Sequence, residues 1–116
     1  MVDQNKRNAT ITKKIIKEIK EIKFFIEGMS EQDFLADIKT QKAVAMTLIN
    51  IGELSKKYTD DFINSKANIP WKYIQATRNI AAHNYEVVKM SVIWNTITVS
   101  LPELQNELTV TKEVSR

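Results

Sequence analysis

The 116-residue sequence has no cysteine, only two glycines and a single histidine. Without cysteine there can be no disulfide framework, thiolate zinc site or thiol nucleophile, so nothing requires an oxidising compartment and we expect a cytoplasmic protein. Gly28 and Gly52 are isolated, which excludes the glycine-rich loops that bind nucleotide phosphates. One histidine cannot build a multi-histidine metal site. We therefore expect neither a metal nor a cofactor.

Long apolar runs are also missing. No stretch approaches the roughly 20 apolar residues of a membrane span, and no apolar run follows the basic residues near the N-terminus. What is present is an even mixture, 43% apolar and 27% charged, with a net charge of +3. This predicts one domain over residues 1–116, with flexible ends at 1–9 and 110–116. The mild positive charge is compatible with a polyanionic partner but does not identify one.

Apolar residues recur at spacings of three and four from Thr10 onward, which predicts an amphipathic helix ending at Gly28. Ser30, followed by two acidic residues, is typical of the N-cap of a second helix. The stretch from Asp37 to about Lys57 is apolar on more than one face, so we expect this helix to be central.

Residues 58–68 form a polar stretch in which Phe62 and Ile63 are expected to act as anchors. A further helix is predicted from Pro70 to Ala82, because proline suits the first turn of a helix. Its expected packing residues are Trp71, Ile74 and Ile80. A last helix is predicted from about Lys89, with a kink expected at Pro102. Its expected packing residues are Val92, Ile93, Ile97, Leu101, Leu104 and Leu108. The predicted fold class is all-α, an up-and-down bundle of four or five helices.

Arg78, His83 and Tyr85 lie within eight residues near the end of the predicted fourth helix. An arginine can hold a phosphate through two hydrogen bonds and stabilise charge that develops on it. A histidine can take a proton from a ribose 2′-hydroxyl or give one to a leaving 5′-oxygen. Asn79, four residues before the histidine, could orient its imidazole. Together these groups suffice for RNA cleavage without a metal.

The same residues also allow ordinary structural roles. A histidine near a helix end is often a capping residue, the arginine a solvated charge and the tyrosine a packing residue. Arg78 and His83, five apart, are separated by about 140° on a regular helix. They converge only if the helix loosens there or if two copies of the motif face each other in a symmetric dimer.

The segment R-x-x-x-x-H-x-Y at 78–85 resembles the motif of the HEPN superfamily, in its HepT-like toxin branch. Three further segments resemble the same family in the same order: IGEL at 51–54, IPWKYI at 69–74, and VIW with the later LPEL at 92–104. The resemblance thus extends from about Ile15 to Leu108. One departure is that no acidic residue lies between Arg78 and His83.

The resemblance implies a HEPN-like homodimer that acts as a metal-independent endoribonuclease, the toxin of a type VII-like toxin–antitoxin system. Its antitoxin would be an MntA-like nucleotidyltransferase that transfers AMP to the motif tyrosine. Carried over to this chain, Arg78 would bind and polarise the phosphate, His83 would be the acid–base residue and Tyr85 would accept AMP. Asn79 matches a polar residue of the family, and Glu53 is a candidate to orient Arg78, with a buried hydrogen bond or a surface acid as the alternative.

Two other functions stay open. The chain could be a non-catalytic module that docks a nucleotidyltransferase and binds nucleotide or substrate through Arg78, or a purely structural dimeric bundle. Five cations near the N-terminus are either contacts to an RNA backbone or a solvated helix face. They are Lys6, Arg7, Lys13, Lys14 and Lys17.

Overall fold

The structure, a computed structural model, describes residues 2–76 and 90–114. All regular structure in these two ranges is helical, as the predicted all-α class requires. The helices are α1 (Val2–Phe25), α2 (Glu31–Leu35), α3 (Ile38–Ser55), α4 (Asp60–Ser65), a helical stretch over 71–76, α6 (Met90–Asn95), the π-helical η1 (Thr96–Ser100) and α7 (Leu101–Val114). Among the described helices, none has the length and apolar character needed to cross a membrane.

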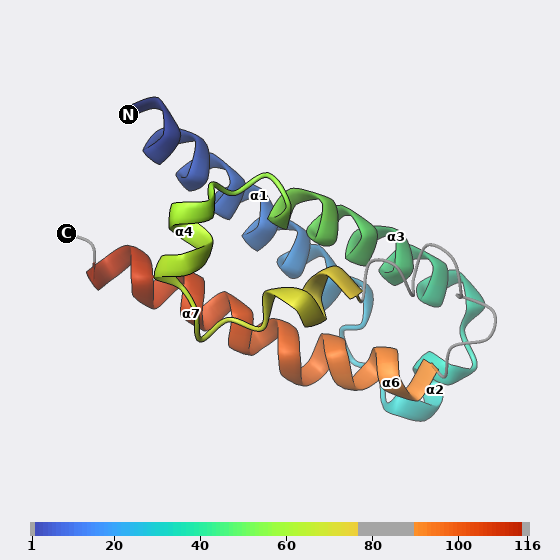
Figure 1. Cartoon of the computed structure of the whole chain (residues 1–116). Coiled ribbons are helices and arrows are strands. Elements are labelled where there is room, and N and C mark those ends of the chain that lie inside the picture. The colour runs from blue at the N-terminus through green and yellow to red at the C-terminus, as the bar shows by residue number, and fades with distance from the viewer. Residues whose placement is uncertain (1, 77–89, 115–116) are drawn as a thin grey trace.

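The helices α1 and α3 pack against each other along most of their length. Figure 1 shows them side by side, with α6, η1 and α7 forming one continuous rod on the opposite side. The short helix α4 and the helical residues 71–76 lie across the bundle between these two parts. The order along the chain therefore brings the two segments that border residues 77–89, which are 71–76 and α6, onto a common core.

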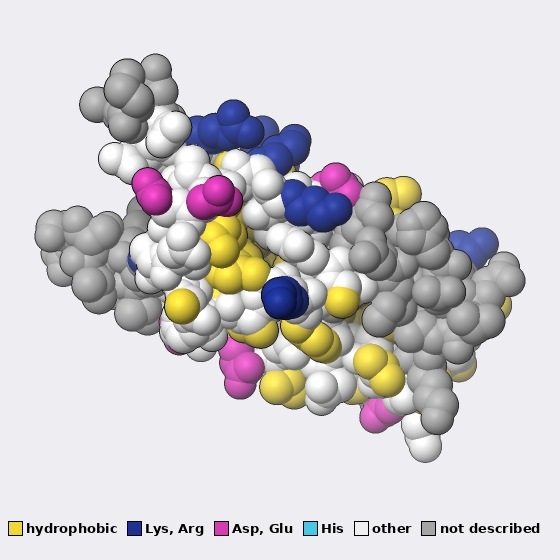
Figure 2. All heavy atoms as spheres, viewed as in Figure 1, with side chains coloured by type: hydrophobic (Ala, Val, Ile, Leu, Met, Phe, Trp, Pro, Cys, Tyr) yellow, Lys and Arg dark blue, Asp and Glu magenta, His cyan; other side chains and the backbone are white. Residues whose placement is uncertain are grey.

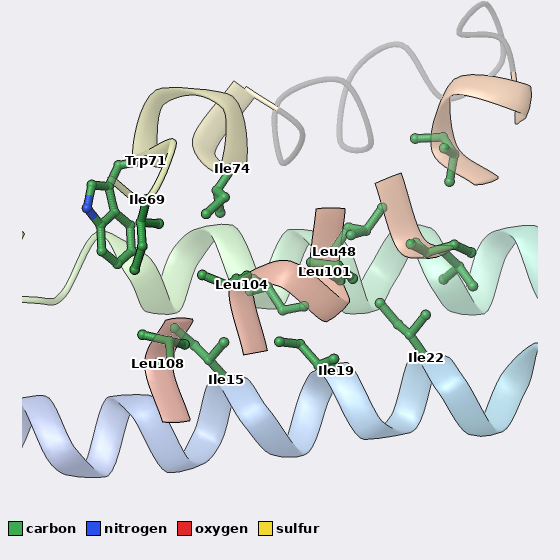
Figure 3. Packing of buried hydrophobic residues seen from close by; sticks show 14 of the residues in the cluster. Ile15, Ile19, Ile22, Leu48, Ile69, Trp71, Ile74, Leu101, Leu104 and Leu108 are labelled. Atoms are coloured by element: carbon green, nitrogen blue, oxygen red, sulfur yellow. The ribbon is translucent and has the colours of Figure 1, made fainter. Parts of the chain in front are cut away.

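Buried aliphatic side chains from three long elements form the core (Figure 3). The α1 helix supplies one row at the spacing that the sequence predicts, and Ile15, Ile19 and Ile22 in this row are almost completely buried. The rows that meet it are Val44, Leu48 and Ile51 from α3, and Ile93, Ile97, Leu101, Leu104 and Leu108 from the α6–α7 rod. Five of the six packing residues predicted for the last helix are thus confirmed.

The α1 helix begins at Val2, eight residues before the predicted start at Thr10. The added turns are held by polar contacts that the apolar pattern does not reveal. The Asn8 side chain donates to the Thr59 hydroxyl (3.0 Å) and accepts from the Thr59 backbone N–H (3.2 Å), while Thr12 shares a 2.7 Å hydrogen bond with the Tyr58 hydroxyl. Flexibility of residues 1–9 and 110–116 stays a prediction.

The predicted helix boundaries between α1 and α3 are confirmed by cap geometry. Gly28 has a positive φ of 78°, a conformation that glycine adopts without strain, in the turn after α1. Ser30 and Asp33 form a capping box at the start of α2, each side chain accepting from the other residue's backbone N–H. Asp37 caps α3 by accepting from the backbone and hydroxyl of Thr40, and these hydrogen bonds lower the pKa of the Asp37 carboxyl.

The structure corrects two expectations about burial. The α3 helix buries one face only, and its apolar residues Ile38 and Met46 are 64% and 60% exposed, so α3 is not enclosed on all sides. Val92, a predicted packing residue, is also exposed, because its neighbour Ile93 faces the core instead. Composition alone cannot distinguish these cases, since an apolar residue on a helix surface is common.

The segment predicted to be only polar, residues 58–68, contains α4. Thr59 caps this helix by accepting from the Phe62 backbone N–H, and Asp60 and Asp61 occupy its first turn. The expected anchor Phe62 stacks on Tyr58 with ring centroids 4.2 Å apart, and the Trp71 ring meets Tyr58 edge-on at 5.4 Å. A threonine followed by two aspartates is the local signal that would have predicted this helix.

Pro102 lies directly after a π-helical turn. Thr96–Ser100 form this turn, and the Leu101 N–H donates to the Thr96 carbonyl five residues earlier rather than four. Because proline has no N–H to donate to the carbonyl four residues before it, a local change of helical register next to Pro102 is expected. The predicted irregularity is thus present, as a widened turn between α6 and α7.

Candidate active site

The helical residues 71–76 lead into the segment that carries the predicted catalytic residues. Trp71 and Ile74 are buried, and the Trp71 indole N–H donates to the Lys66 carbonyl at 3.1 Å. Pro70 immediately precedes this helix, and its carbonyl accepts from the Ile74 N–H. Two buried side chains, Trp71 and Ile74, thus hold this helical stretch against the core (Figure 3).

The α6 helix follows this segment in the sequence. Ile93 is buried, and the half-buried Trp94 packs on Phe34 of α2 with ring centroids 5.3 Å apart. The two flanks are joined to each other, since the Tyr73 hydroxyl lies 2.6 Å from the Thr96 hydroxyl. Residues 76 and 90 are therefore both attached to well-packed elements.

The predicted site residues Arg78, Asn79, His83 and Tyr85 lie outside the described residues, as does the packing residue Ile80. Their roles, and the convergence of Arg78 with His83, stay predictions. Among the described residues no group of three or more His, Cys, Asp or Glu side chains could hold a metal ion.

Glu53, the remaining predicted site residue, is half-buried in the last turn of α3. It borders a shallow hollow of about 400 Å³ between α1 and α3, together with Lys14, Lys17 and Lys57. Glu18 lies in the same hollow and accepts a 3.0 Å hydrogen bond from Asn50. Glu53 thus lies among three lysines, a setting in which a carboxylate can orient cations, while its pairing with Arg78 stays a prediction.

A second cavity, of about 330 Å³, lies beside the flanks of the site. Its lining includes the apolar residues Ile51, Ile74 and Leu104, together with Tyr73 and with Thr96 and Ser100 of the π-helical turn. Asn68 and Glu107 also line this cavity, and the Asn68 side chain donates to Glu107. This volume is in the range of small-ligand pockets.

Tyr58 is excluded from acid–base chemistry near neutral pH. Burial raises the pKa of its phenol to about 12, although the hydrogen bond with Thr12 acts in the opposite direction. Its role is structural, because it connects α1 to the aromatic cluster under α4.

The sequence did not indicate that Tyr73 and Thr96 join the two flanks, or that Asn50 and Lys57 share a hollow with Glu53. Each becomes relevant only through contacts between residues far apart in the chain, such as the 23 positions between Tyr73 and Thr96. The hollow beside Glu53 likewise forms only because α1 and α3 lie side by side. No local pattern carries this information.

Comparison with known proteins supports a single family. A family model described as "Ribonuclease HepT-like" matches residues 15–110. The chain belongs to the HepT-like ribonuclease family. The match includes the flanks of the site, Glu53 and the whole segment from Arg78 to Tyr85.

Individual relatives agree with the family. "Putative RNase MJ0127" of Methanocaldococcus jannaschii is 36% identical over 88 residues, covering 76% of this chain and 73% of the relative. "Probable ribonuclease HepT" of Thermococcus cleftensis is 36% identical over 93 residues, covering 80% and 84%. "Putative RNase TTE0752" of Caldanaerobacter subterraneus is 33% identical over 93 residues, covering 78% and 83%. The comparison with solved structures found no match.

Proposed function

We propose that this HepT-like chain is a metal-independent endoribonuclease, the toxin of a type VII-like toxin–antitoxin system acting in the cytoplasm. The observation that carries the proposal is the R-x-x-x-x-H-x-Y motif at 78–85, which falls inside the family match over 15–110. Further support comes from the well-packed flanks on both sides of this segment. RNA is the substrate class that the family description implies.

In the proposed reaction a ribose 2′-oxygen attacks the adjacent phosphorus. His83 accepts the 2′-hydroxyl proton, and the bond to the 5′-oxygen breaks, leaving a 2′,3′-cyclic phosphate. A proton must reach the departing 5′-oxygen, and the second His83 of a homodimer would supply it in the protonated form. Arg78 stabilises the charge that grows on the phosphate oxygens through paired hydrogen bonds. No step needs a metal, and Asn79 and Glu53 act by positioning.

The proposed regulation rests on the resemblance, which implies that the motif tyrosine, here Tyr85, accepts AMP. An MntA-like nucleotidyltransferase would transfer AMP from ATP to the Tyr85 hydroxyl, with pyrophosphate as the leaving group. The added bulk and negative charge would block a site that has to accept an RNA phosphate.

The test is RNA cleavage in EDTA by protein whose intact mass shows no bound AMP. We expect the wild type to cut RNA, whereas His83→Ala and Arg78→Ala each slow cleavage by about 100-fold or more. Lys39→Ala, which removes an exposed cation from α3, is the control and should cut at the wild-type rate. Products should carry 2′,3′-cyclic phosphates.

Tyr85→Phe separates regulation from catalysis. This variant should still cut RNA but should gain no AMP when incubated with the nucleotidyltransferase and ATP. If unmodified wild type leaves tRNA, mRNA and rRNA intact, the ribonuclease proposal fails and the non-catalytic binding module takes its place. If His83→Ala cuts as fast as wild type, the proposed role of His83 is wrong.

A further inference from the structure

The positive charge of this protein is concentrated in its first helix. The first 20 residues contain six cations and two acids, for a net charge of +4, whereas the remaining residues contain eleven cations and twelve acids, for a net charge of −1. The overall charge of +3 therefore understates how basic one part of the molecule is. The six cations are Lys6, Arg7, Lys13, Lys14, Lys17 and Lys20.

All six cations are exposed, while Ile11, Ile15 and Ile19 of the same helix are buried in the core. The cations thus occupy the outer side of α1, which we call the α1 basic face. Lys56 and Lys57 at the end of α3 are also exposed, and Lys57 meets Lys14 and Lys17 at the hollow between the two helices. Figure 2 shows Lys and Arg side chains gathered over the α1 and α3 region.

The shape and charge of this surface favour an extended polyanion over a small anion. From Lys6 to Lys20 the helix rises about 21 Å, which is far longer than one phosphate group. The hollow itself is nearly neutral, because Glu18 and Glu53 share it with the three lysines. A free phosphate or mononucleotide would meet these carboxylates, whereas a strand lying along the outer ridge of lysines would not.

The same surface is unlike a protein-binding interface. Such interfaces are depleted in lysine and centre on aromatic and apolar anchors. Between residues 4 and 20 no large hydrophobic side chain is exposed; the exposed Phe24 lies beyond the basic face. Cations without apolar anchors are typical of binding to a nucleic-acid backbone, which depends on charge and not on sequence.

We propose that the α1 basic face binds the phosphate backbone of the RNA substrate outside the site of cleavage. This inference rests on the proposed ribonuclease function, since it names a second contact for the same substrate. The contact is sequence-independent, so it raises affinity for long RNA without choosing the bond that is cut. Its strength falls with salt, because each neutralised phosphate releases condensed counterions.

The test is binding of a fluorescein-labelled 12-nucleotide RNA with 2′-O-methyl groups, which lacks the attacking hydroxyl and cannot be cut. Lys14→Gln/Lys17→Gln removes two cations from the α1 basic face. Its matched control, Lys39→Gln/Lys42→Gln, removes two exposed cations from the other end of α3. Anisotropy is measured between 0.05 and 0.5 M salt, chosen as roughly the range over which phosphate contacts respond.

We expect Lys14→Gln/Lys17→Gln to lower the slope of log affinity against log salt by about 1.4, and affinity at 0.1 M salt roughly 25-fold, if each lysine meets one phosphate. The control double variant should bind as wild type does. Lys14→Arg/Lys17→Arg, which keeps the charge, should restore binding. Thermal melting should be unchanged in all three, since these side chains are exposed.

Equal binding by the two double variants would overturn the proposal. It would also be overturned if Lys14→Gln/Lys17→Gln kept its RNA affinity but lost binding to the nucleotidyltransferase, which would assign the face to a protein partner. The outcomes for the two proposals differ. Wild type that binds the 12-mer through these lysines but cuts no RNA in EDTA contradicts only the ribonuclease proposal.

Discussion

At the α4 end of the bundle, side-chain hydrogen bonds tie α1 to Tyr58 and Thr59 beside an aromatic cluster, whereas at the α2 end α2 meets α6 through one aromatic pair. Asn8 and Thr12 of α1 reach Thr59 and Tyr58 across the α4 end. At the α2 end Phe34 is fully buried against Trp94. Each joint supports one flank of residues 77–89, the first through Trp71 and the second through α6.

The two kinds of contact differ in how much free energy they contribute and in how strictly they fix the orientation of the helices. Burying a large aromatic ring contributes several kcal/mol but tolerates some change of orientation. A hydrogen bond between side chains contributes about 1 kcal/mol, yet it is made only at one distance and one register. The Phe34–Trp94 contact should therefore contribute mainly to stability, and the hydrogen bonds from Asn8 and Thr12 should determine how α1 is aligned with α4.

The largest effect is expected for Phe34→Ala, which removes the buried ring that packs on Trp94 at the α2 end. We expect the free energy of unfolding to fall by about 3 to 5 kcal/mol, because the ring is lost and a cavity is left. Urea unfolding measures this change. Phe24→Ala is the matched control, since that ring is 73% exposed, and it should change stability by about 0.5 kcal/mol or less. Similar losses in the two variants would contradict the comparison.

A smaller effect is expected from ionisation of Tyr58 at the α4 end. Below pH 10 the phenol is protonated in both folded and unfolded chains. Between pH 10 and about 12 only the unfolded chain ionises, because burial raises the folded pKa to about 12, so stability falls as pH rises. The loss should be about 2 to 3 kcal/mol in wild type.

The control for this prediction is Tyr58→Phe, which keeps every lysine but lacks the phenol. Its free energy of unfolding should be lower than that of wild type by about 1 kcal/mol at pH 7, since the Thr12 hydroxyl loses its partner. Above pH 10 it should then decline less steeply than wild type. Parallel pH profiles for the two proteins would show that Tyr58 is not the responsible group.

The smallest effect is expected for Asn8→Ala, which removes both hydrogen bonds to Thr59. We expect a loss of about 1 to 2 kcal/mol, because the Thr59 N–H is left without the Asn8 acceptor in a partly buried place. Asn5→Ala, on an exposed turn of the same helix, should be near neutral. Hydrogen exchange should show faster opening of α4 in Asn8→Ala but not in Asn5→Ala. Unchanged exchange in α4 would mean that Asn8 does not align the two helices.

Sequence reasoning succeeded where the signal is local. The row of isoleucines on α1, the turn at Gly28 and the cap at Ser30 were predicted, since each depends on residues within a few positions. It failed at the start of α1 and at α4. The reason is that Asn8 and Thr12 look like surface residues until Thr59 and Tyr58 are placed opposite them.

The candidate site divides in the same way. The motif from Arg78 to Tyr85 consists of residues close together in the sequence, so the sequence alone suggested the family and the chemistry. The family model that matches residues 15–110 confirms the suggested family. Phe34 was not singled out, although it is fully buried, because a lone phenylalanine in a five-residue helix has no periodic partners.

The sequence by itself determined the helices that face a core, most of their ends and the family. Helical periodicity and capping act over a few residues, so the printed order of residues contains them. Only the tertiary structure decided which helices pack against each other. That packing creates the hydrogen bonds between α1 and the residues before α4, the hollow between α1 and α3, and the exposed position of the α1 basic face. These features join residues 32 to 51 positions apart, and they exist only once the chain has packed.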